Sequence, residues 1–167
     1  MTGPEPWLRG PLPGIHPLVQ PLFFSFAQVR EDLAKHTTGL PPDAVWRQVG
    51  PLPALGFQLR HIAGSVDRLM TYLMDRPLSD AQMTALRAEA EPSASLEDLL
   101  AAVDASLNEA EQRLRAIDPA TIHDARFIGR KRLPTTVLGL LVHIAEHTQR
   151  HLGQAITTAK LGREPQS

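Results

Sequence analysis

The fold is decided in the stretch His143-Ile-Ala-Glu-His147-Thr-Gln-Arg-His151-Leu-Gly-Gln154, which lies inside a longer segment of helical periodicity. Its three histidines follow one another at intervals of four residues. Such an interval advances a helix by about 40° around its axis and about 6 Å along it, so the three imidazoles share one face. Neutral imidazole is a common protein ligand for zinc, nickel and iron. The stretch therefore predicts a helix that carries part of a metal site.

Composition narrows the chemistry that such a site can use. The chain has 167 residues, the usual size of one domain with a core of its own. It contains no cysteine, which excludes disulfides, cysteine nucleophiles and thiolate metal ligands. Any bound metal must therefore be held by histidine, aspartate or glutamate.

Charge and hydropathy narrow the range of partners. The formal net charge of −1 offers no electrostatic basis for binding nucleic acid. The one basic cluster, Arg126 to Arg132, is short and is interpreted as a loop. No apolar run approaches the length of a membrane span, and the N-terminus does not have the form of a signal peptide. We expect a cytoplasmic protein that acts on a small molecule, without nucleic-acid or membrane partners.

Apolar residues recur at helical spacing in four long segments, which predicts an all-α fold: a four-helix bundle with long, proline-rich connections. The first helix begins near Pro17 or Pro21 and ends near His36. The others are expected at about 54–75, 95–117 and 135–161, with a short helix at about 79–89 that a capping box opens. Thr135 is the expected N-cap of the last helix, and residues 119–134 are expected to form a long connection.

These segments also predict how the chain is divided. Residues 1–14 form a proline-rich N-terminal arm, which is extended or disordered unless Trp7 docks. Residues 15–162 form the bundle domain, and residues 163–167 form a C-terminal tail.

The second half of the metal site is expected on the second helix. His61 lies there among apolar residues, and bundles commonly build metal sites from inward residues on facing helices. We predict that His61, His147 and His151 are the ligands. Three neutral ligands leave a coordination position open, as in catalytic rather than structural sites. No side chain is assigned as catalytic, since a metal-bound water or thiolate would take that role.

Four further residues are expected around the ligands: His143, Gln154, Gln58 and Ser65. Gln154 is expected to hydrogen-bond a ligand imidazole or a facing backbone group. Gly153 beside it lowers helix stability by about 1 kcal/mol relative to alanine, which predicts close packing against another helix.

Each histidine also has a purely structural interpretation. A single histidine on an apolar helix face, such as His61, is more often a core residue than a ligand. A pair at positions i and i+4, such as His147 and His151, also occurs on solvated helix faces. Glu146 lies one turn from Arg150, which indicates an ordinary surface pair rather than a ligand.

The chain resembles the DinB/YfiT-like superfamily of metalloproteins from about Pro17 to Leu161. The last helix in that family carries a histidine, three residues, and a second histidine followed by Gly-Gln, and His147, His151, Gly153 and Gln154 match this pattern. His61 matches the family's third ligand. The resemblance implies a four-helix bundle, often a homodimer, with zinc, nickel or a similar divalent ion held by three histidines. Neither the N-terminal arm nor Arg126 to Arg132 matches the family pattern.

The resemblance implies a metal-dependent enzyme, because characterised relatives include transferases that join low-molecular-weight thiols to electrophiles, and a thiol-dependent isomerase. We therefore expect a thiol-dependent S-transferase or isomerase that acts on small electrophiles. A metal-dependent hydrolase, with metal-bound hydroxide as nucleophile, would use the same ligands. A bundle that serves as a non-enzymatic stress-response binding module is the third interpretation.

Overall fold

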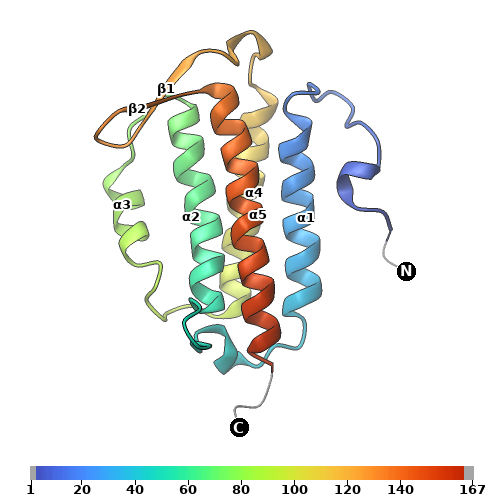
Figure 1. Cartoon of the computed structure of the whole chain (residues 1–167), viewed down its shortest axis with the longest axis vertical. Coiled ribbons are helices and arrows are strands. Elements are labelled where there is room, and N and C mark those ends of the chain that lie inside the picture. The colour runs from blue at the N-terminus through green and yellow to red at the C-terminus, as the bar shows by residue number, and fades with distance from the viewer. Residues whose placement is uncertain (1–2, 164–167) are drawn as a thin grey trace.

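The computed structural model describes residues 3–163 and shows an all-α bundle with one small sheet (Figure 1). The four long helices and the short one are present, close to where their apolar periodicity predicts them. Their bounds are α1 Gln20–Thr37, α2 Leu55–Leu73, α3 Asp80–Arg87, α4 Leu96–Arg115 and α5 Val137–Leu161. Short 3₁₀ turns lie at Pro6–Leu8, Pro42–Val45 and Pro119–Thr121.

The four long helices close around a single apolar core. Helix α5 packs against α1 on one side and α2 on the other, and α4 completes the bundle against α2 and α1. The apolar stripes of these helices meet inside, with Phe26, Leu59, Leu107 and Ile144 all fully or almost fully buried. Burying one such side chain stabilises the fold by roughly 1.5–3 kcal/mol, so the stripes account for the association of the helices. Helices α2 and α5 run in opposite directions, and their shared face holds the histidines.

Side-chain caps fix the ends of several helices. Ser79 and Ser95 each accept a hydrogen bond from the amide three residues on, and Gln82 and Asp98 return the contact, so both are capping boxes. Helix α5 is capped by Thr136, whose hydroxyl accepts from the Gly139 amide. The prediction of Thr135 as N-cap was therefore wrong by one residue, because the paired strand continues through Thr135 and its last residue, Thr136, caps the helix.

The predicted connection at 119–134 contains a β-hairpin that the sequence analysis interpreted as a loop. Strand β1 (Ala125–Ile128) pairs antiparallel with β2 (Leu133–Thr136), in the register Ala125 with Thr136 and Ile128 with Leu133. Only four residues form each strand, and Pro134 cannot donate to a ladder, so alternation was too short to be recognised. The hairpin lies beside the C-terminal end of α2 (Figure 1).

The described part of the N-terminal arm, residues 3–14, lies beside α1. The Arg9 guanidinium makes two hydrogen bonds, of 2.5 and 2.8 Å, to the Glu31 carboxylate. Pro6 is buried, whereas Trp7 is 61% exposed and does not anchor the arm. Residues 1–2 of the predicted arm and 164–167 of the predicted tail lie outside the described residues, and the division into arm, domain and tail stays a prediction.

None of the helices within residues 3–163 combines the length and the apolar character that crossing a lipid bilayer requires.

Candidate metal centre

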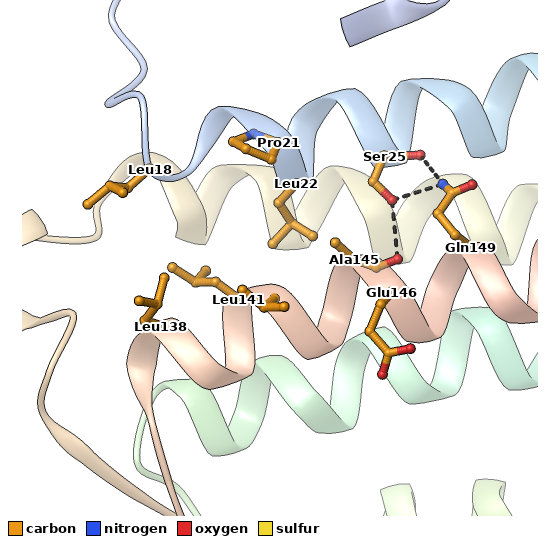
Figure 2. A pocket seen from close by; sticks show the side chains of 10 residues that line it. Leu18, Pro21, Leu22, Ser25, Leu138, Leu141, Ala145, Glu146 and Gln149 are labelled. Atoms are coloured by element: carbon orange, nitrogen blue, oxygen red, sulfur yellow. Dashed lines mark hydrogen bonds between the residues drawn. The ribbon is translucent and has the colours of Figure 1, made fainter.

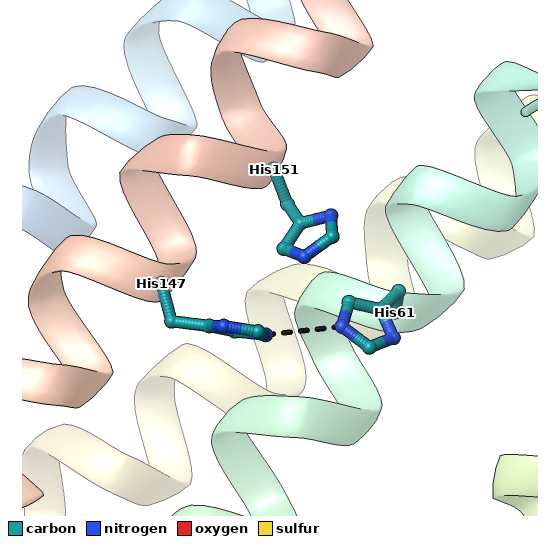
Figure 3. Close-up of side chains that lie close together, drawn as sticks. All are labelled: His61, His147 and His151. Carbon is teal, nitrogen blue, oxygen red and sulfur yellow. Dashed lines mark hydrogen bonds between the residues drawn. The ribbon is translucent and has the colours of Figure 1, made fainter. Parts of the chain in front are cut away.

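Helices α2 and α5 bring three histidines from distant parts of the sequence to one point (Figure 3). His61, His147 and His151 each direct one ring nitrogen inward, and these nitrogens lie within 4.8 Å of one another. His61 Nε2 is 3.0 Å from His147 Nε2. The His151 ring centroid lies 4.2 Å from that of His61 and 4.6 Å from that of His147. The structure thus brings together the three histidines that were predicted as ligands, two from their spacing and His61 from its place on the facing helix.

The outward nitrogens of two histidines are held by acceptors. His61 Nδ1 lies 2.7 Å from the Glu89 carboxylate, and His151 Nδ1 lies 2.8 Å from the side-chain oxygen of Gln58. Because a carboxylate or amide oxygen only accepts, we assign the proton of each ring to Nδ1. Each Nε2 then presents its lone pair to the centre. The Nδ1 atom of His147 is buried and has no hydrogen-bond partner among the described residues.

Glu89 contacts the histidine group and was not identified from the sequence. It follows α3, and its second oxygen lies 2.8 Å from Arg68 Nη2 on α2. The side chains of Glu89 and Arg68 are only 7% and 10% exposed. Burial alone would raise the pKa of the Glu89 carboxyl, but the hydrogen bond to His61 and the charge of Arg68 outweigh it and hold that pKa below its usual range. The carboxylate is therefore ionised next to His61.

Gly64 makes room for this buried ion pair. A Cβ at this position would lie 2.6 Å from Arg68 Nη1 and 2.9 Å from Glu89 Oε1. The pair thus lies directly on the backbone of α2, one turn beyond His61. This glycine, placed in the middle of a helix beside a histidine, was the one local signal of the contact in the sequence.

The two histidines of α5 are held neutral by their surroundings. Burial, reinforced by the positive charge that His61 would carry if protonated, lowers the pKa of His147 to about 4 and that of His151 to about 4. Both rings are therefore uncharged at neutral pH, with a proton on only one of their two nitrogens. An unprotonated Nε2 is the form that binds a metal ion.

The four residues expected around the ligands have different surroundings. Gln58 is fully buried and contacts His151 directly. Gln154 reaches that histidine only indirectly, since its side-chain oxygen accepts from Gln58 Nε2 at 3.0 Å. Ser65 is buried, and its hydroxyl donates to the Ile62 carbonyl of its own helix.

His143 lies beside the group and not in it. Its ring centroid is 5.2 Å from that of His147, and its Nδ1 is 2.7 Å from Glu146. Glu146 also pairs with Arg150, as the surface interpretation predicted. His143 thus extends the exposed edge of the histidine row.

The expected close packing at Gly153 was wrong. This glycine is exposed, and a Cβ there would meet no atom within 4 Å. The close contact lies instead on α2, at Gly64.

A separate apolar groove lies on the opposite side of α5, between α5 and α1 (Figure 2). Its volume is about 360 Å³, and its walls include Leu22, Leu141 and Ala145. The Ser25 hydroxyl and the Gln149 amide are hydrogen-bonded within it at 2.9 Å. None of the three converging histidines lines this groove.

Residues 25–155 match the family model described as the DinB superfamily, over a range that includes all three histidines. The chain belongs to the DinB superfamily. The fold of the chain is also similar to that of a crystal structure of a protein from Streptococcus pneumoniae solved by a structural genomics consortium. The two share 11% sequence identity with a TM-score of 0.61, over 85% of this chain and 88% of that one. No curated protein matches the chain.

Membership of the DinB superfamily and the three-histidine group together fit a metal-binding protein. The spacing of the nitrogens fits as well, because three nitrogen ligands of one tetrahedral zinc ion lie about 3.3 Å apart. The observed 3.0 Å and the 4.8 Å limit bracket that value, so small side-chain rotations would suffice to complete the site.

Proposed function

We propose that this protein is a metal-dependent enzyme in which His61, His147 and His151 hold one divalent cation, zinc or nickel. The observation that carries the proposal is the convergence of three imidazole nitrogens within 4.8 Å. Without an ion, two Nε2 atoms only 3.0 Å apart can share at most one hydrogen bond. A shared cation would satisfy all three lone pairs at once.

The surrounding residues support a site for catalysis more than one for structure. Three ligands leave a position for a further molecule, and the His61 side chain is 18% exposed, so the group reaches solvent. When bound, the cation would lower the pKa of a thiol or a water molecule beside it. Glu89 holds the His61 ring and supplies a negative charge, and Gln58 holds the His151 ring.

We further propose that the reaction is the transfer or isomerisation of a small electrophile with a low-molecular-weight thiol as cosubstrate. The chain has no cysteine, so a thiol nucleophile must come from a second molecule. A hydrolase would benefit from a free carboxylate beside the metal to accept a proton from water. One oxygen of Glu89 contacts His61 and the other forms an ion pair with Arg68, and these partners lower the pKa of the carboxyl, so Glu89 is a weak base. This favours a thiol, because a thiol needs less help to ionise than water does.

The metal site is tested by elemental analysis of the purified protein after growth with zinc and nickel. We expect about one ion per chain in the wild type, and its loss in His61→Ala, His147→Ala and His151→Ala. His143→Ala is the matched control, since this histidine lies in the same row but outside the group. A folded wild type that holds no metal would contradict the proposal.

The reaction is tested by incubating the metal-loaded protein with a model electrophile, with and without an added low-molecular-weight thiol. We expect turnover that requires both the thiol and an intact His147. Turnover that proceeds without thiol would replace this proposal with the hydrolase. A metal-loaded protein that is inactive under both conditions would favour the binding module.

A further inference from the structure

A second cavity lies at the other end of α2, where that helix meets the β-hairpin. Its volume is about 330 Å³, within the range of pockets that hold small molecules. Tyr72 contributes to its wall, three helical turns and about 16 Å beyond His61 on the same helix. The cavity is therefore separate from the histidine group.

The walls of this cavity are fixed by hydrogen bonds to backbone carbonyls near the end of α2. The Arg126 Nε–H donates to the Leu73 carbonyl at 2.8 Å and ties the hairpin to the end of α2. On the other wall, the Asp75 amide donates to the Tyr72 carbonyl at 2.9 Å, and the Arg76 amide donates to the Thr71 carbonyl at 3.1 Å. This pair of bonds is a Schellman motif, which sets the direction of the chain after the helix.

Two guanidinium groups without carboxylate partners line the cavity. Arg30 and Arg68 each pair with an acid, whereas Arg76 and Arg132 form no ion pair or side-chain hydrogen bond with any residue in the range 3–163. The Arg132 guanidinium lies 4.3 Å from the centre of the Phe127 ring, which fixes its plane. Asp75 is the one carboxylate in the lining, so positive charge prevails.

The backbone at two of these residues is strained. Among the described residues, Asp75 and Arg132 are the only non-glycine residues with positive φ, at 55° and 48°, and both line this cavity. The left-handed conformation costs an L-residue roughly 1–2 kcal/mol, and glycine would avoid that cost. At Asp75 the left-handed conformation belongs to the Schellman motif, so the strain at Arg132 is the one that marks a position at which a side chain has a role.

We propose that this cavity binds a small organic anion. A carboxylate or phosphate group would be held by Arg76 and Arg132, because guanidinium groups bind these oxyanions with two parallel hydrogen bonds. The rings of Tyr72 and Phe127, together with Pro77, would contact an aromatic or apolar body. In the basic run from Arg126 to Arg132, Arg132 would thereby bind the anion, and Arg126 would hold the hairpin in place.

The proposal is tested by calorimetric titration of the full chain with phenyl phosphate, benzoate and inorganic phosphate. We expect phenyl phosphate to bind more tightly than inorganic phosphate, since only the former offers a ring. The ratio of the phenyl phosphate affinity to the benzoate affinity then shows whether the site prefers a phosphate or a carboxylate. Arg76→Gln and Arg132→Gln should each weaken binding by about tenfold or more, the usual effect of losing a charge-assisted hydrogen bond.

Arg130→Gln is the matched control, because Arg130 belongs to the same basic run but does not line the cavity. It removes the same charge and should change binding by less than about twofold. If Arg130→Gln weakens binding as much as Arg132→Gln, the effect is diffuse charge and the site is refuted.

A second control separates this cavity from the metal centre. The double variant His147→Ala/His151→Ala should bind phenyl phosphate as the wild type does. Loss of binding in that variant would place the anion at the histidines and overturn the proposal, as would a wild type that shows no binding at millimolar concentrations. A metal-free protein that still binds the probe would leave this site intact even if the proposed enzyme function failed.

Discussion

Helices α2 and α5 both supply histidines, but they hold them by different chemistry. On α2, His61 is fixed by a buried carboxylate that is itself paired with a buried guanidinium. On α5, His151 is fixed by the neutral amide of Gln58, and His147 has no partner at Nδ1 within the described part of the chain. The α2 side of the site thus depends on an ion pair between residues far apart in the sequence. The α5 side depends on a neutral hydrogen bond and on the spacing of its two histidines along one helix.

This difference predicts that the charged side is the more sensitive to substitution. Glu89→Ala would leave Arg68 buried without a partner, and breaking such a pair typically costs about 3–5 kcal/mol. We expect a loss of that order in the free energy of unfolding, measured by urea denaturation. Glu91→Ala is the control, because Glu91 is exposed nearby, and it should change stability by less than about 0.5 kcal/mol. If Glu89→Ala and Glu91→Ala lowered the free energy of unfolding equally, the α2 side would not depend on the ion pair.

Acid should act mainly on the α5 side. The pKa values of His147 and His151 are lowered to about 4, below the ordinary value of 6.5, so the unfolded chain takes up protons that the folded chain refuses. Their contribution to stability is complete above pH 6.5 and is lost as the pH falls from 6.5 to about 4. We expect this loss of stability in acid to be the second largest effect, after that of Glu89→Ala, since two rings contribute to it.

The acid effect is measured on metal-free protein by denaturation at a series of pH values. The double variant His147→Ala/His151→Ala should show a much flatter dependence between pH 6.5 and 4.5. The ion pair of Glu89 contributes at lower pH, because its pKa lies below the usual 4.5. An unchanged slope in the double variant would refute the assignment.

The two glycines near the ligands give a third and smaller contrast. Gly64→Ala would force the Arg68–Glu89 pair off the helix, and such overpacking typically costs about 1–3 kcal/mol. Gly153→Ala meets open space and should instead stabilise the protein by up to about 1 kcal/mol through helix propensity. Thermal or urea denaturation of the two variants measures the expected loss of stability in Gly64→Ala and the expected gain in Gly153→Ala. Stabilisation by Gly64→Ala would contradict the geometry.

The smallest expected effect concerns the neutral side. Gln58→Met keeps the volume of the side chain but removes the acceptor for His151 Nδ1. Loss of such an outer contact lowers metal affinity by about tenfold, equivalent to about 1.4 kcal/mol. Competition with a chelating dye measures this change, and Gln149→Met, on the opposite side of α5, should leave the affinity unaltered.

The sequence predicted the α5 side better than the α2 side because the α5 contacts follow from one helix, whereas the α2 contacts join residues far apart in the sequence. The spacing of His147 and His151 is a property of one helix, and the apolar stripes place that helix in the bundle. His61 required only the further assumption that facing helices share a site. These inferences use periodicity, which a single sequence displays.

Glu89 and the hairpin could not be predicted in this way. Glu89 is one of two acidic residues between α3 and α4, and its importance depends on how α3 lies against α2. The strands of the hairpin have four residues each, and one contains Pro134, so no alternation distinguishes them from a loop. Gln154 was expected to hydrogen-bond a ligand imidazole or a facing backbone group, but its contact with the Gln58 side chain depends on side-chain rotamers that the sequence does not specify.

Hydrogen exchange in helix α3 is expected to respond to metal binding at the candidate metal centre. This helix has no buried residues and is held to α2 by polar contacts, including those from Gln82 to Asp67 and Thr71 at 2.7 and 2.8 Å. Its amides should therefore exchange with deuterium by local opening, well before the rest of the bundle. Each opening would also release Glu89 from His61. An ion held by His61 would favour the closed form, so metal loading should slow deuterium uptake in a helix that never touches the metal.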